Sequence, residues 1–188
     1  MKRPYYAYIL TACALISVSC RQPDTAAAND YRAQGDSIIK ATFDTLRNAL
    51  TIAIHNKGLQ GAVAYCNENA YPVTAVLASG NITIKRVAEK YRNPKNAPDS
   101  TDAIQWRVFT AAKANGDSLQ PAIIAGKNIV HYYKPILLQP MCSACHGKTG
   151  KDIPLPVAAT IDSLYPNDKA KDFTVGDLRG MWKISFAQ

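Results

Sequence analysis

The 188-residue sequence is short of acidic residues: 14 Asp and Glu face 22 Lys and Arg, for a formal net charge of +8. It nevertheless lacks a long Lys/Arg run and a basic stretch interleaved with aromatic residues, so we expect no nucleic-acid partner. The basic residues indicate a mildly basic, solvated surface, with a docking face for an acidic redox partner protein as the alternative. Internal repeats and low-complexity tracts are also missing, and the length favours one domain.

The sequence also lacks an apolar run long enough to span a membrane comfortably. Its apolar residues 5–18 follow Lys2 and Arg3 and end at Ser19-Cys20, which is the three-part layout of a secretory signal. Residues 16–20 (ISVSC) resemble a loose lipobox, whose cysteine receives the lipid. The alternatives are a plain secretory signal with an incidental Cys20, or an uncleaved anchor.

The lipoprotein interpretation divides the chain into three parts. A signal peptide would occupy residues 1–19, a flexible polar tether residues 20–29, and the domain residues 30–188. Lipidation of Cys20 would anchor the protein to the membrane of the cell envelope. We expect it to face the periplasm or to lie on the outer membrane.

Cysteine is scarce, with five residues, and most of them have an assignment. Cys13 falls within the signal and Cys20 is the lipid site. Cys142 and Cys145 form a CxxC pair, which leaves Cys66 without a disulfide partner in an oxidising compartment.

The strongest motif is Cys142-Ser143-Ala144-Cys145-His146, because CxxCH is the pattern of covalent haem c attachment. Its two thiols can add to the two vinyl groups of one haem, and one helical turn then places His146 beneath the iron as the proximal ligand. A thioredoxin-like pair, half of a zinc site and a strained disulfide are the alternatives. The sequence offers no second CxxC or HxxxH pair to complete a zinc site.

Spacing alone leaves the distal iron ligand open. Met181 follows His146 at a distance, as the methionine ligand does in small cytochromes c. His131 is in an expected strand, where a histidine is more often an ordinary sheet residue. Cys66 is on the apolar face of an expected helix, where a free cysteine is more often a core residue. Arg86 and Arg92 are candidate contacts for the haem propionates.

Hydrophobic spacing predicts helices first and then strands mixed with helices, which is typical of an α+β domain with an antiparallel sheet. The expected helix over 101–115, capped by Asp99 or Ser100, would bury Ile104, Val108 and Ala111. The other expected elements are helices over 30–57, 59–70 and 72–79, with breaks at Gly58 and Gly80, strands over 81–86, 128–134 and 181–186, a loop over 91–98 and an irregular segment over 155–171.

Four stretches carry a family resemblance, and together they span most of the mature chain: residues 64–66 (AYC), 91–99 (YRNPKNAPD), 132–136 leading to 142–147 (YYKPI, CSACHG), and 165–170 with 176–180 (YPNDKA, GDLRG). They resemble the haem-c-binding PAS-like domains, long catalogued as a domain of unknown function. The resemblance implies a PAS-like antiparallel sheet with N-terminal helices that holds one covalent haem c. It also implies that Cys66 is the distal ligand, opposite His146.

This ligand pair would favour the ferric state and a low potential, whereas methionine would raise it. We therefore expect an exported, lipid-anchored, monohaem cytochrome-like protein that acts in electron transfer or redox sensing with an unidentified redox partner. A gas sensor, in which a small molecule displaces Cys66, is the alternative. We do not expect an enzyme such as a peroxidase, because no distal acid and base are paired for peroxide cleavage.

Overall fold

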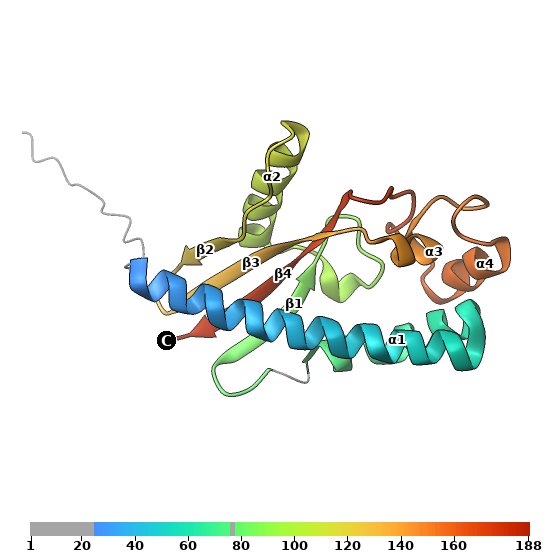
Figure 1. The fold of residues 1–188 in the computed structure, drawn as a ribbon, viewed down its shortest axis with the longest axis horizontal. Coiled ribbons are helices and arrows are strands. Elements are labelled where there is room, and N and C mark those ends of the chain that lie inside the picture. Colours follow the sequence, from blue (N-terminus) through green and yellow to red (C-terminus); the bar gives the residue numbers. More distant parts are fainter. Residues whose placement is uncertain (1–24, 76–77) are drawn as a thin grey trace, which may run out of the picture.

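The computed structural model describes residues 25–75 and 78–188, and these form four α-helices and one four-stranded antiparallel sheet (Figure 1). The expected signal peptide and Cys20 lie outside the described residues. Within the described part of the chain, no helix combines the length and apolarity needed to cross a membrane. The α+β class expected from the sequence is confirmed.

The sheet has the order β1-β4-β3-β2, so the last strand of the chain lies between the first and the third. The expected strands correspond to β1 (Ile82–Val87), β3 (Ile129–Leu137) and β4 (Leu178–Ala187). The expectation omitted β2 (Ala122–Ala125), a four-residue edge strand too short to show an alternating pattern.

Helix α1 (Thr25–Ala75) is longer than expected and bends at Gly58. It begins within the expected tether over 20–29, because Ala26, Ala27 and Ala28 have the highest intrinsic helix propensity. At Gly58 the backbone leaves the helical region with φ 66°, a conformation that glycine adopts without strain, which confirms the expected break. Pro72 starts no new helix, because α1 continues through it to Ala75, although the proline has no N–H to donate to the carbonyl of residue 68.

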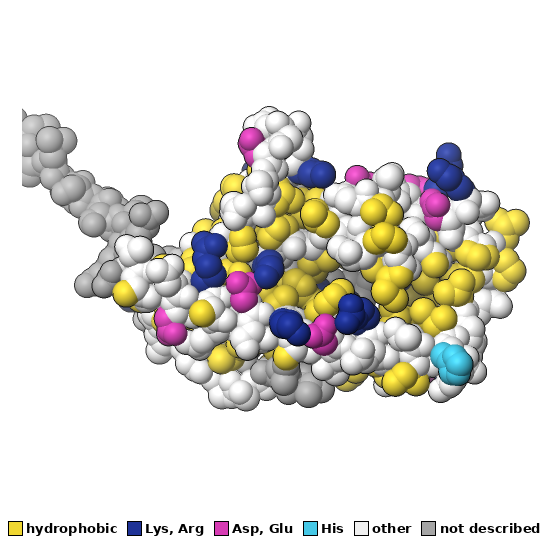
Figure 2. Space-filling view, in the orientation of Figure 1, with side chains coloured by type: hydrophobic (Ala, Val, Ile, Leu, Met, Phe, Trp, Pro, Cys, Tyr) yellow, Lys and Arg dark blue, Asp and Glu magenta, His cyan; other side chains and the backbone are white. Residues whose placement is uncertain are grey.

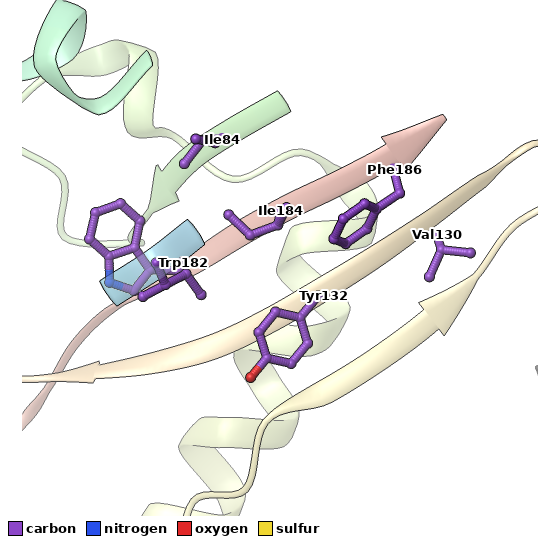
Figure 3. Packing of buried hydrophobic residues seen from close by; sticks show 7 residues of the cluster. Ile84, Val130, Tyr132, Trp182, Ile184 and Phe186 are labelled. Carbon is purple, nitrogen blue, oxygen red and sulfur yellow. The ribbon is translucent and has the colours of Figure 1, made fainter. Parts of the chain in front are cut away.

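The two faces of the sheet are covered by different helices. Ile39 of the first part of α1 packs on one face, against a cluster from β1, β3 and β4. Figure 3 shows the side chains of this cluster that come from the three strands. The members of this cluster on the sheet are Ile84, Val130, Tyr132, Trp182, Ile184 and Phe186. Phe109 of α2 (Ser100–Ala114) packs on the other face, against Val87, Tyr133 and Met181.

Helix α2 begins where expected, with Asp99 as its N-cap. The prediction of its buried side is wrong, because a different side of the helix faces the core. Ile104 and Val108 are 61% and 55% exposed, and Ala111 is exposed too. The buried residues are Asp102, Gln105 and Phe109. The spacing of apolar residues predicted the wrong side because the Asp102 carboxylate binds polar partners on the sheet and is buried with them.

The segment expected to be irregular, residues 155–171, contains α4 (Leu155–Leu164). Its prolines are compatible with a helix start, since Pro154 is the N-cap and Pro156 lies in the first turn, where backbone N–H groups have no intrahelical acceptor. Val157, Ala158 and Ile161 of α4 are buried and form a cluster with Val63 from the part of α1 after Gly58.

The Asp102 side chain is fully buried, and its polar contacts are expected to stabilise the fold. One oxygen accepts from the Tyr133 hydroxyl at 2.8 Å and lies 2.7 Å from Lys183 Nζ, and the other lies 3.7 Å from Lys85 Nζ. We expect Asp102→Ala to lower the free energy of unfolding by about 3 kcal/mol, because the buried Tyr133 hydroxyl loses its acceptor and the nearly buried Lys183 ammonium keeps only the exposed Asp99 as a described carboxylate partner.

Urea unfolding of the purified protein measures this effect. Asp44→Ala is the control, because the Asp44 side chain is 37% exposed and its ion pairs among the described residues are with the exposed Lys40 and Arg47. A loss of stability for Asp102→Ala no larger than that of Asp44→Ala would contradict the prediction.

Candidate functional site

A cavity of about 250 Å³ lies between α1, one end of the sheet and the segment that carries the CxxCH motif. This volume is close to the lower limit of small-molecule sites, roughly 300 Å³. Figure 2 shows hydrophobic side chains gathered around a hollow in the middle of this face. The apolar residues that line the cavity include Phe43, Leu46, Leu50, Ile54, Leu59, Ala62, Val63, Ile136, Leu138 and Trp182.

The cavity brings together six of the residues singled out from the sequence. Its lining includes the motif residues Cys142, Cys145 and His146. It also includes Cys66, Arg86 and Arg92, which come from α1, β1 and the loop after β1. Residues that are distant in sequence and chemically distinctive therefore share one apolar cavity.

The motif folds into a 3₁₀ turn (Pro140–Cys142) followed by the one-turn helix α3 (Ser143–His146). The Ser143 hydroxyl donates to Pro140 O at 2.7 Å and helps to close the turn. Gly147 is needed at its end, because an added Cβ would lie 2.5 Å from Asp152 Cβ and 2.7 Å from Ser143 O. One compact turn therefore presents both thiols and the imidazole to the cavity.

The hydrogen bond of His146 fixes which ring nitrogen is available. Its Nδ1 lies 2.8 Å from Ala170 O, an acceptor that requires a proton on Nδ1. Burial lowers the pKa of His146 well below its usual value, and the nearby cations Arg179 and Arg92 lower it further. The ring is therefore neutral at physiological pH, and Nε2 keeps the lone pair with which an imidazole binds a metal.

The three cysteines of the described chain are free thiols. Burial raises the pKa values of Cys66, Cys142 and Cys145, and proximity to Cys145 raises that of Cys66 further. The expected alternative of a disulfide between Cys142 and Cys145 is not the state that the structure has. In residues 25–75 and 78–188, no group of three or more His, Cys, Asp and Glu could hold a metal ion, so the zinc alternative gains no further ligands.

Two partly buried arginines that line the cavity, Arg86 and Arg179, each have a guanidinium nitrogen without a partner among the described residues. Arg86 donates through Nη2 to Ala70 O at 3.2 Å, and Arg179 donates through Nη1 to Lys90 O at 3.2 Å. The Nε atoms of Arg86 and Arg179 are buried and have no hydrogen-bond partner among the described residues. Burial, with Arg92 and Arg86 nearby, lowers the pKa of Arg179 to about 10, so it remains a cation at neutral pH. An unpaired buried N–H is costly and indicates an acceptor that completes the site.

The sequence patterns did not indicate Arg179 as a site residue, although it lies within the GDLRG stretch that contributed to the family resemblance. Nothing in its spacing separates it from the other basic residues. Arg92 was singled out, but its guanidinium already pairs with the Asp168 carboxylate at 3.0 Å and donates to Cys145 O at 2.7 Å. Arg86 and Arg179 therefore have donors to spare, whereas those of Arg92 are largely used.

Met181 and His131 do not reach the cavity. Side chains alternate between the faces of a strand, and Trp182 faces the cavity while Met181 packs with Val87 and Phe109 on the opposite face. His131 lies 2.8 Å from Ser185 Oγ through Nδ1 and is not part of the cavity lining. Strand alternation therefore turns Met181 away from the cavity, which disfavours the alternative of Met181 as the distal ligand.

Comparison with known proteins gave one family and one solved structure. The model of a family described as Tll0287-like matches residues 23–187. The crystal structure of the cyanobacterial haem protein Tll0287 is similar, with a TM-score of 0.61 and 26% sequence identity over 85% of this chain and 96% of that chain. No curated protein matches the chain significantly.

Proposed function

The chain belongs to the Tll0287-like family, and from this premise we propose that it is a haem protein that acts in electron transfer or redox sensing. One haem c would be attached covalently through Cys142 and Cys145, with His146 as the proximal and Cys66 as the distal iron ligand. The observation that carries the proposal is the convergence of three thiols and a neutral imidazole on one apolar cavity.

The residues present fit a haem. The cavity offers an apolar lining for the macrocycle, two thiols at the CxxCH spacing and an imidazole whose Nε2 lone pair is free. The unpartnered Nε atoms of Arg86 and Arg179 fit the carboxylates of propionates, since buried guanidinium groups pair preferentially with carboxylates. We therefore revise the propionate contacts to Arg86 and Arg179.

Cys66 fits the distal position because of where α1 places it. It lies eight residues after the bend at Gly58, on a stretch of α1 that packs against α4 through Val63. The charges of Arg86 and Arg92 favour its thiolate, in opposition to burial. Met141 also lines the cavity, but it is 47% exposed and adjacent to Cys142, so it belongs to the side that carries the motif.

This ligand set favours electron exchange over catalysis. When bound, haem supplies a one-electron redox couple. Cys66 and His146 would fill both axial positions from the protein, which leaves no open site for a substrate, and the anionic thiolate would stabilise the ferric state. The apolar side chains that line the cavity would limit the contact of the bound group with water, and so the reorganisation that accompanies electron exchange.

We also propose a location in the cell and a partner protein. The N-terminal pattern supports export and lipid anchoring at Cys20, with the domain facing the periplasm or lying on the outer membrane. A separate redox protein would exchange electrons with the haem or receive its signal. Tyr71 and Leu137 line the cavity and are 42% and 38% exposed, so an edge of the bound group would lie close to the surface.

Cys66→Ser tests the distal ligand. We expect wild-type protein produced with a haem-attachment system to keep its haem in denaturant and to show a low-spin ferric signal in electron paramagnetic resonance (EPR). The variant should keep the covalent haem, lose the thiolate signature and have a higher midpoint potential, because a neutral ligand no longer stabilises ferric iron. Met181→Leu is the control and should leave the signal unchanged. A silent Cys66→Ser would contradict the assignment, and wild-type protein without covalent haem would contradict the whole proposal.

Arg179→Gln and Arg86→Gln test the propionate contacts. Each should shift the propionate bending bands in resonance Raman spectra and lower the midpoint potential, because a cation near the iron disfavours ferric charge. Arg107→Gln is the matched control, since Arg107 is exposed on α2 and, within the described part of the chain, its side chain donates to Ala103 O of its own helix. Unchanged propionate bands in both cavity variants would argue against these contacts.

Cys20→Ala tests the anchor. Wild-type protein expressed in a bacterium should incorporate labelled palmitate and sediment with membranes. The Cys20→Ala variant should incorporate no label and stay in the soluble fraction, because the lipid would be its attachment to the bilayer. Cys66→Ser is the control for loss of a cysteine and should remain on membranes. Labelled, membrane-bound Cys20→Ala would show that the anchor lies elsewhere.

A further inference from the structure

A buried ion pair joins two loops next to the cavity. Arg92, after β1, and Asp168, after α4, are 76 residues apart, yet they meet through two hydrogen bonds, Nε to Oδ1 at 3.2 Å and Nη2 to Oδ2 at 3.0 Å. Their side chains are 12% and 2% exposed. Such a forked pair has a defined geometry, so each partner holds the other in orientation as well as in distance.

Both members of the pair also bind the backbone of Ala170, whose carbonyl bonds to His146. Asp168 Oδ1 accepts from Ala170 N at 2.8 Å, and Arg92 Nη2 donates to Ala170 O at 3.3 Å. The same Ala170 O accepts from His146 Nδ1 at 2.8 Å. Arg92 Nη2 further donates to Cys145 O at 2.7 Å, directly before the histidine. The pair therefore fixes both the acceptor of the imidazole and the backbone that carries it.

Stability alone is a weak reason for this arrangement. Taking two charges out of water is costly, and replacing a buried ion pair by apolar residues of similar volume is often neutral or stabilising. The alternative reason is specificity of geometry at a functional histidine. Groups that bind the second nitrogen of a ligating imidazole fix its tautomer and ring orientation, and they tune its basicity.

We propose that Arg92 and Asp168 are positioning residues that hold the His146 ring, through Ala170, in the orientation and tautomer required of an axial ligand. This inference rests on the function proposed above. Arg92 also shares the Ala170 carbonyl with His146, and this limits how strongly that oxygen can draw on the Nδ1 proton. Arg92 is thereby assigned to the imidazole in place of the propionates.

The test uses the complete protein with its covalent haem. Arg92→Lys keeps the charge and loses the fork, and Asp168→Asn keeps the shape and loses the charge. The double variant Arg92→Met/Asp168→Leu fills the space with apolar side chains, so it preserves folding if the single variants are unstable. Lys183→Met is the control, because it breaks a buried ion pair with Asp102 on the opposite face of the sheet.

We expect all three Arg92 and Asp168 variants to retain covalent haem and to show a second low-spin ferric EPR signal, because the ring is no longer held in one orientation. The Lys183→Met protein should be less stable towards urea but keep the single wild-type signal. A single, unchanged signal in the variants of the pair, with a raised midpoint potential for Asp168→Asn alone, would reduce the pair to a charge effect and overturn the inference. Wild-type protein without covalent haem would instead refute the proposed function.

Discussion

The packing of the second part of α1 against α4 is the constraint on which the cavity depends. Before Gly58, α1 covers one face of the sheet through Ile39. After the bend, Val63 joins the buried cluster of Val157 and Ile161 from α4, and the partly buried Cys145 packs on the same cluster. One apolar contact therefore sets the spacing between the helix that carries Cys66 and the turn that carries the motif.

A second level of organisation lies in the polar groups around His146. A buried imidazole can be held neutral by desolvation alone, but desolvation does not choose between its two nitrogens. Here the choice is made by Ala170 O, and the position of that carbonyl is held by Arg92 and Asp168. Burial of the ring, the tautomer and the backbone of the motif are therefore parts of one arrangement, which is assembled from the loops after β1 and α4.

The predictions from sequence patterns that were wrong share one cause, which is contacts between residues far apart in the chain. Helix α2 has an apolar stripe at Ile104 and Val108, yet Asp102 occupies its buried side because Tyr133 and Lys183 provide partners that no helical periodicity registers. In α4, the prolines that indicated irregular structure occupy the cap and first turn, where they suit a helix. Met181 had a suitable sequence position for a ligand, but the alternation of β4 directs it to the face covered by α2.

The α+β class, the core strands, the break at Gly58 and the one-turn spacing of the CxxCH motif could be predicted from the chain alone, because each depends on a short periodicity or on neighbouring residues. Which distant side chains share the cavity with the motif depends on the tertiary fold. It brought in Cys66, left Met181 and His131 out, and revealed the unpartnered Nε of Arg179. Such juxtapositions depend on how helices and loops pack around the sheet, and the pairing of Arg92 with Asp168 across 76 residues leaves no local signature in the chain.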